Sequence, residues 1–224
     1  MSSLNRDGVR KRTGGTLGLL KRLVFPPTCA GCNVAETWLC ERCRESLIDL
    51  RAEPDIRLGA RMRSGDLFMA RYHFAEPIRR AIHLLKYEGQ RSRAGWLAGE
   101  LMPLLEVVST SDSLLQPVPL SAERIRSRGF NQAHEICLAL SSRTGHSVVD
   151  GVARVRHTRP QVELKGADRI ANVQGAFRAS RAVAGRHIVL VDDVVTTGAT
   201  MRECASACYA AGAAIVSGLA VASG

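Results

Sequence analysis

The sequence predicts an α/β fold in which a parallel sheet is flanked by helices, with a small cysteine-rich module before it. Segments typical of strands alternate with segments typical of helices after residue 66, and this alternation favours a parallel sheet. Ile188 to Val191 form an uninterrupted apolar run, as in a central strand that is buried on both faces. Four cysteines within residues 29–43 indicate the module.

Composition limits the class of protein. The chain has 224 residues, of which 46% are hydrophobic and 4% aromatic, enough for one substantial core and a small additional module. The sequence contains no membrane span. Its apolar stretch at residues 17–25 is interrupted by Lys21 and Arg22 and is too short for a signal peptide. We therefore expect a cytoplasmic protein in a reducing environment.

The net charge of +10 is concentrated in two places. Residues 1–24 contain six Lys or Arg and one acid, and residues 124–169 contain nine Lys or Arg and four acids. A basic chain end is most often solvated and frayed, and contact with DNA or a membrane is the alternative. The second cluster lies in segments that connect strands, where anionic ligands would arrive.

The chain divides into parts with different patterns. We expect a basic tail with a short helix at 1–24, a cysteine module at 25–50, a linker at 51–65 and an α/β domain at 66–224. In that domain, residues 67–74 have the pattern of a strand, and Pro77 suits the first turn of a following helix. The next expected elements are a helix over Ala94–Val108, a strand over Leu114–Leu120, a helix over Asn131–Ser142, strands over Val148–Ala153 and His187–Asp192, a helix over Ala199–Ala211 and a strand over Ala214–Val221.

The most informative segment is the turn that follows the apolar strand. Asp192 and Asp193 are expected at the carboxyl end of that strand, where open α/β sheets bind ligands. The helix that begins after the turn offers unpaired N–H groups and a positive dipole end, which favour an anion. Ribose hydroxyls or a hydrated Mg²⁺ would satisfy the two acids, and ordinary helix capping is the alternative interpretation. The predicted phosphate-binding residues are Thr196, Thr197, Gly198, Ala199 and Thr200.

This string resembles the phosphoribosyl pyrophosphate (PRPP) motif of type I phosphoribosyltransferases. Further segments are similar to the ComF/GntX branch of that fold, namely Pro117–Leu120, Leu85-Lys86-Tyr87, residues 124–132 and the cysteine module. The resemblance implies a phosphoribosyltransferase-like domain at 66–224 with its PRPP motif at 188–200. It also implies that the candidate catalytic residues Asp192 and Asp193 face the ribose hydroxyls, and that residues 196–200 hold the 5-phosphate.

Two basic segments complete the predicted ligand site. Arg124, Arg128 and Gly129 are expected in a loop that grips the pyrophosphate, because guanidinium groups bind phosphate bidentately, although a solvated surface loop is the alternative. Residues 154–169 are expected to form a lid that closes over the ligand. The lid residues expected to bring positive charge are Arg156, Arg159 and Lys165.

The resemblance implies a transfer reaction whose acceptor the sequence does not identify. A nucleophile would displace pyrophosphate from ribose C1 through an oxocarbenium-like state, with Mg²⁺ and arginines stabilising the leaving group. Residues 66–110 are the candidate segment for recognising the acceptor. The competing hypothesis is a non-catalytic competence factor for DNA uptake, which binds single-stranded DNA or helicase-type partners and uses the fold as a scaffold. Few aromatic residues are available for base stacking, which counts against this hypothesis.

The cysteine module has the spacing of a metal site. Cys29, Cys32, Cys40 and Cys43 form a C-x2-C-x7-C-x2-C pattern, and four thiolates suit a structural, tetrahedral Zn²⁺ in a zinc-ribbon-like module. Iron or disulfides are the alternatives. The other three cysteines, at 137, 204 and 208, are expected in the core as small apolar residues, and the six histidines show no ligand spacing.

Overall fold

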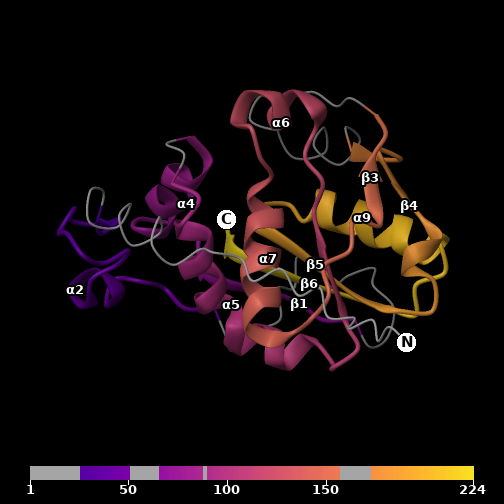
Figure 1. Ribbon diagram of the computed structural model, residues 1–224, viewed down its shortest axis with the longest axis horizontal. Helices are drawn as coiled ribbons and strands as arrows, with labels where there is room; N and C mark the ends of the chain where they lie inside the picture. The colour runs from indigo at the N-terminus through magenta and orange to yellow at the C-terminus, as the bar shows by residue number, and fades with distance from the viewer. Residues whose placement is uncertain (1–25, 51–65, 88–89, 157–172) are drawn as a thin grey trace, which may run out of the picture.

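The computed structural model describes residues 26–50, 66–87, 90–156 and 173–224. Its main sheet is parallel, with the strand order β1-β6-β5-β2 (Figure 1). The predicted α/β fold with a parallel sheet flanked by helices is therefore confirmed. The strands of this sheet are β1 (Phe68–His73), β2 (Leu114–Pro117), β5 (His187–Val195) and β6 (Ile215–Ser223).

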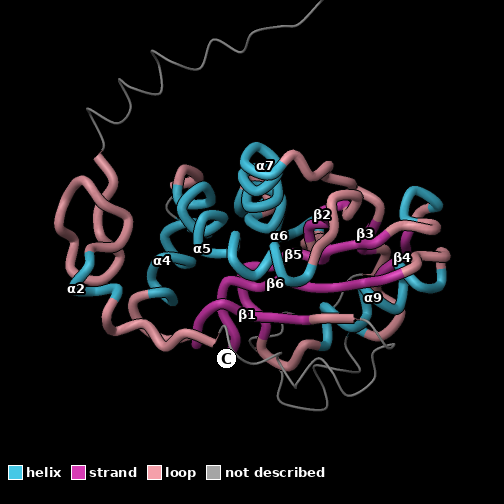
Figure 2. The backbone as a smooth tube through the Cα atoms, turned by 90° about the horizontal axis from the view of Figure 1, so that it is seen from below, coloured by secondary structure: helices cyan, strands magenta, loops and turns pink. Residues whose placement is uncertain are grey.

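Helices cover both faces of the sheet (Figure 2). On one face, α4 (Ile78–Tyr87), α5 (Arg93–Val108) and α7 (Gln132–Thr144) bury a core that includes Val189 and Val191 of β5. On the other face, α9 (Ala199–Ala210) packs over Ile188 and Leu190. Alternate residues of β5 thus enter different cores, as the side-chain period of a strand requires.

Strand β5 is longer than the sequence predicts. Its pairing with β6 continues through Val194 opposite Ala222 and Val195 opposite Ser223. The predicted end at Asp192 is therefore wrong, because the apolar pair after the acids keeps the chain in the sheet. Asp192 and Asp193 lie inside the strand, near its carboxyl end.

The segment after β2 also differs from expectation. The strand ends at Pro117, and residues expected to form a loop make the short helix α6 (Ala122–Arg128). The Ser121 side chain accepts a hydrogen bond from the Arg124 N–H at the start of this helix, and Gly129 ends it with a φ of 75°. Helix α6 buries none of its residues, so it has no apolar periodicity from which to predict it.

A small second sheet lies beside the main one. Strand β3 (Val152–Arg154) is antiparallel to β4 (Phe177–Ala179), and a 3₁₀ turn at Arg181–Val183 follows. Of these two strands the sequence predicts only β3, as the end of a strand over 148–153. Residue Val148 instead makes a single parallel bridge to Leu115.

The cysteine module packs against α4 and α5. It contains the short helix α2 (Glu41–Arg44), and Arg44 makes a bidentate pair with Glu100 of α5. Arg93 is fully buried at the junction: it donates to the carbonyl oxygen of Thr28 over 2.8 Å and stacks on Trp38. The module is therefore held by a buried cation and by main-chain acceptors, rather than by a large apolar core of its own.

Some expectations lie outside the described residues: the basic tail at 1–24, the linker at 51–65 and the lid residues Arg159 and Lys165. Within the described residues, no helix is both long and apolar enough to span a bilayer. The three cysteines at 137, 204 and 208 are buried, as predicted.

The close contact between the paired strands β1 and β6, where Phe68 lies opposite Gly218, gives a direct stability prediction. A Cβ at Gly218 would lie 2.4 Å from Cδ1 of Phe68, whereas a Cβ at Gly99 of α5 meets nothing within 4 Å. We expect Gly218→Ala to lower the free energy of unfolding by about 2 kcal/mol through overpacking. Gly99→Ala should leave it unchanged or raise it, because alanine favours a helix. Urea unfolding of both variants checks the contrast, and equal stabilities would contradict this close packing.

Candidate phosphate-binding and metal sites

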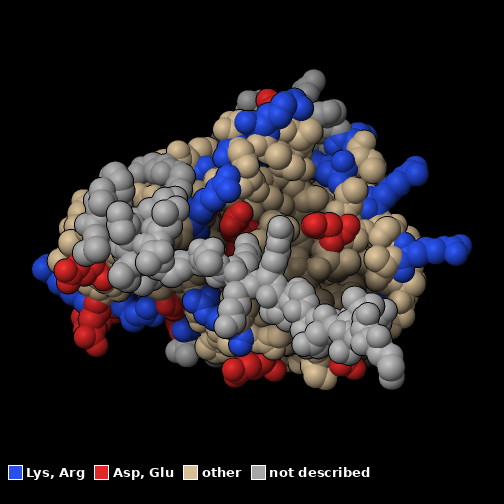
Figure 3. Space-filling model, viewed as in Figure 1, with Lys and Arg blue, Asp and Glu red and all other residues tan. Residues whose placement is uncertain are grey.

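A cavity of about 540 Å³ opens at the carboxyl edge of the sheet. In Figure 3, acidic side chains and Lys or Arg side chains lie close together around the hollowed centre of one face. The cavity walls come from α4, from the connection between β2 and α7, from β3 and from the end of β5. Lining residues include Phe74, Lys86, Tyr87, Arg124, Arg128, Gln132, Arg154 and residues 192–201.

The turn between β5 and α9 forms one wall of this cavity. Gly198 is the N-cap of α9 and has a φ of 68°, a conformation that favours glycine. The Thr197 hydroxyl accepts a hydrogen bond from the Ala199 N–H over 3.4 Å. The predicted phosphate-binding residues Thr196, Thr197, Gly198, Ala199 and Thr200 all line the cavity. Hydroxyl donors and the positive end of a helix of twelve residues thus meet at one place, which suits an anion.

Asp193 points toward the face covered by α4 and α7. Its Oδ2 lies 2.7 Å from Nζ of Lys86 and accepts a hydrogen bond from Nε2 of Gln132 over 3.3 Å. Burial alone would raise the pKa of Asp193, but the Lys86 ammonium, with a smaller effect from Arg128, holds that pKa below its usual value. Asp193 is therefore an ionised, firmly held acid.

Asp192 has the opposite electrostatic character. It is partly exposed on the cavity side, and its Oδ1 accepts the N–H of Asp193 over 2.8 Å. Burial, followed by the nearby charge of Asp193, raises the pKa of Asp192 well above its usual value. Two neighbouring acids thus differ in environment, and Asp192 is the one whose charge a ligand donor or cation would stabilise most.

Two of the three arginines that line the cavity have neighbouring charges. Arg124 of α6 and Arg154 of β3 both line the cavity. Burial lowers the pKa of Arg154, and the neighbouring charge of Arg124 lowers it further. Like charges held together at a cavity favour a bound anion between them. Sequence reasoning missed Arg154, since it placed this residue only at the start of a lid.

The other described residues predicted for the two basic segments do not all reach the cavity. Arg128 lines the cavity, donates to the Tyr87 hydroxyl over 2.9 Å and stacks on that ring. Gly129 serves as the C-cap of α6 and is not among the lining residues. Arg156 donates to the Gln174 carbonyl oxygen over 2.6 Å and is also not among them.

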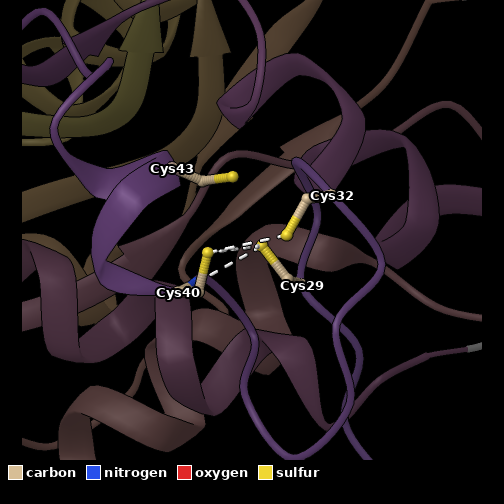
Figure 4. Close-up of side chains that lie close together, drawn as sticks. All are labelled: Cys29, Cys32, Cys40 and Cys43. Atoms are coloured by element: carbon tan, nitrogen blue, oxygen red, sulfur yellow. Dashed lines mark hydrogen bonds between the residues drawn. The ribbon is translucent and has the colours of Figure 1, made fainter.

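The four cysteines of the module converge on one point (Figure 4). Their Sγ atoms all lie within 4.8 Å of one another. Four sulfurs around a tetrahedral Zn²⁺ would be about 3.8 Å apart, given a Zn–S bond of about 2.3 Å, so a small inward movement closes the site. The N–H groups of Gly31 and Cys40 donate to Sγ of Cys29, which favours its thiolate. Although burial opposes this, hydrogen bonds lower the pKa of Cys29 to about 6.

The module leaves little space around these sulfurs. A Cβ at Gly31, between the first two cysteines, would lie 2.5 Å from Sγ of Cys43. The donor set consists of sulfur atoms alone, and thiolates prefer Zn²⁺ or iron over Mg²⁺ or Ca²⁺. The cluster therefore fits the metal site that the spacing predicts.

Comparison with known proteins places these features in a family context. Residues 125–222 match the family model of the phosphoribosyl transferase domain. The chain is 40% identical to the DNA utilization protein YhgH of Escherichia coli K12 over 152 residues, which cover 64% of this chain and 66% of that protein. It is 28% identical to competence protein F of Haemophilus influenzae, over 86% of this chain and 82% of that protein. The match to YhgH thus spans just under two thirds of the relative's length.

Solved structures show a weaker likeness. The allosteric regulatory enzyme of purine biosynthesis is 22% identical with a TM-score of 0.37, over 58% of this chain and 25% of that one. Hypoxanthine phosphoribosyltransferase from Trypanosoma cruzi is 13% identical with a TM-score of 0.34, over 60% of this chain and 63% of that one.

Proposed function

Since this chain has a phosphoribosyl transferase domain and is a homologue of competence protein F and YhgH, we propose that its cavity binds PRPP together with Mg²⁺, or a related ribose 5-phosphate. One observation carries the proposal. A helix N-terminus rich in threonine, an acidic pair and three arginines all line the same cavity. Each group suits a different part of a phosphorylated ribose with a pyrophosphate at C1.

The residues divide among the parts of the ligand. Thr196, Thr197 and the N–H groups at the start of α9 bind the 5-phosphate. Asp192 and Asp193 accept hydrogen bonds from the ribose hydroxyls, while Arg124 and Arg154 face the pyrophosphate. Mg²⁺, brought with the ligand, would neutralise charge that develops on the leaving pyrophosphate.

We propose a transfer of phosphoribose as the reaction. An acceptor nucleophile attacks C1 of the ribose, the bond from C1 to the pyrophosphate oxygen breaks, and pyrophosphate leaves with the electron pair. The carboxylates of Asp192 and Asp193 keep the ribose oriented, and the arginines stabilise the departing charge. The proposed acceptor side is the end of α4, where Tyr87 lines the cavity.

A calorimetric titration of Mg²⁺–PRPP into the full chain tests binding. We expect saturable binding that Arg124→Gln weakens by about tenfold to a hundredfold, because a charge-assisted contact contributes about 1.5–3 kcal/mol. Arg126→Gln is the matched control, since Arg126 lies in the same helix α6 but not among the lining residues. No heat and no thermal stabilisation at millimolar PRPP would defeat the proposal. Pyrophosphate release with a panel of nucleobases and amines then separates an enzyme from a binding protein.

A second candidate function is binding of single-stranded DNA in competence or DNA utilization, with helicase-type proteins as partners. The names of the relatives favour it, as does the basic segment from residue 124 onward. A titration with oligothymidylate at several salt concentrations tests this function, because phosphate contacts make affinity fall steeply with salt. Competition by PRPP would place the DNA in the cavity, whereas binding unaffected by PRPP would place it elsewhere on the chain.

We also propose that the four cysteines hold a structural Zn²⁺. Four thiolates leave no open coordination position, so the metal would stabilise the module rather than take part in the reaction.

A further inference from the structure

We propose that Lys86 and Gln132 are positioning residues, which hold the Asp193 carboxylate in one orientation for the ribose of bound PRPP. The inference rests on the proposed function and extends it to two residues that the PRPP motif does not contain. Neither residue is predicted as part of the site by sequence reasoning, because each lies in a helix far from Asp193 in the chain.

The geometry around Asp193 is the first observation. Lys86 from α4 and Gln132 from α7 both reach the same oxygen, Oδ2, over 2.7 and 3.3 Å. The strand holds the main chain of Asp193, and the two helices hold its side chain from different directions. A carboxylate held in this way offers its remaining acceptor directions to a ligand without rotating.

The second observation is a polar atom without a partner. Among the described residues, Oε1 of Gln132 is one of three buried side-chain atoms that lack a hydrogen bond. Turning the amide over would point Oε1 at the ionised oxygen of Asp193, so the donor side must face the acid. Gln132 is 2% exposed, and leaving its oxygen unpaired costs free energy that an apolar side chain would not cost.

The third observation is the burial of the ion pair itself. The side chain of Lys86 is 18% exposed and that of Asp193 is 7% exposed. Well-packed apolar residues often stabilise a protein as well as such a buried pair does. A gain in stability therefore does not explain why Lys86, Gln132 and Asp193 occur together in the interior. Their place at a cavity wall points to a role in holding the acid for a ligand.

Affinity for Mg²⁺–PRPP is the quantity to measure, by calorimetry from pH 5.5 to 8.5. We expect Lys86→Met and Gln132→Leu to weaken binding, the first by about 30-fold and the second by about fivefold, and Lys86→Arg to recover part of the loss. Arg79→Met is the matched control, because Arg79 is an exposed cation of the same helix that pairs with Glu76.

The pH dependence of PRPP affinity distinguishes a positioning role of Lys86 from a general loss of structure. Among the residues that the structure describes, the charged groups that face Asp193 are Lys86 from α4, Arg128 from α6 and Asp192 from its own strand. Without Lys86 the pKa of Asp193 rises, so binding that needs its carboxylate should weaken further as the pH falls. The control Arg79→Met should keep the pH profile of the original protein.

A double variant separates binding from folding. Lys86→Met and Asp193→Leu together remove the buried pair, so we expect unfolding midpoints close to those of the original protein but no measurable PRPP binding. Equal affinity and equal pH dependence in Lys86→Met and the original protein would overturn this inference alone. Absence of PRPP binding by the original protein would overturn the proposed function, and this inference with it.

Discussion

Asparagine at position 193 should destabilise the protein, whereas asparagine at position 192 should stabilise it. Asp193→Asn removes the charge that pairs with the mostly buried ammonium of Lys86, 2.7 Å away. Breaking one partner of a buried pair costs about 3–5 kcal/mol, and the partial exposure of Lys86 lowers the expected loss to about 2 kcal/mol. Asp192→Asn removes a carboxyl group whose ionised form is disfavoured by burial and by the charge of Asp193, so we expect a gain of about 1 kcal/mol at pH 7.

The two effects should depend on pH in opposite ways. The pKa of Asp193 is lowered in the folded state. Its charge therefore stabilises the protein above the pKa of the unfolded state, about 3.9, and this stabilisation is lost as the pH falls through the folded-state pKa. The pKa of Asp192 is raised in the folded state. The destabilisation by this acid therefore grows as the pH rises from the unfolded-state pKa of about 3.9 to the folded-state pKa. The stabilisation by Asp192→Asn should therefore disappear near pH 4.

Urea unfolding of both variants between pH 4 and pH 8 measures these differences. Each kcal/mol corresponds to about 2–4 °C in melting temperature for a chain of this size. Both variants should lose affinity for PRPP, so Asp192→Asn combines a more stable fold with a weaker ligand site. If both substitutions destabilise the protein equally at pH 7, the unequal roles of the two acids are wrong.

Substitution of one cysteine should release the metal from the amino-terminal module and make its backbone less ordered. Cys32 is exposed, so Cys32→Ser in a module without metal would change stability by only about 0.5 kcal/mol. With Zn²⁺ bound, the same change breaks one of four thiolate bonds in a segment with few apolar contacts of its own. We therefore expect residues 26–50 to lose protection from amide hydrogen exchange, and bound zinc to fall from about one per chain to near zero.

Val34→Ala is the matched control, because Val34 is 50% exposed in the same module and carries no ligand atom. This variant should keep its zinc and its exchange protection. Metal analysis by atomic emission also distinguishes zinc from iron. Full protection of the module in Cys32→Ser would mean that contacts such as those of Arg93, and not a metal, hold it in place.

The sequence predicts the fold and part of the site, because both depend on strong local patterns. The apolar run before Asp192 identifies β5, and the two C-x2-C pairs identify the cysteine cluster. The threonine-rich turn lies where it is expected, since a strand followed by a helix determines its position. In each case neighbouring residues in the chain carry the signal.

The remaining parts of the site depend on contacts between distant segments. Lys86 lies in an amphipathic helix, and only the packing of α4 on the sheet brings it to Asp193. Arg154 reaches the cavity through a small antiparallel sheet whose second strand, β4, has only three residues. Helix α6 buries none of its residues and so gives no periodic signal, which is why its arginines are expected on a loop rather than on a helix.

A crystal structure of the protein with Mg²⁺ and PRPP tests the proposed ligand site most directly. The 5-phosphate should lie against residues 196–200 at the start of α9, with the ribose hydroxyls at Asp192 and Asp193 and the pyrophosphate toward Arg124. Crystals grown at saturating PRPP that show the ligand elsewhere on the chain, or this cavity filled only by water, would contradict the proposed function.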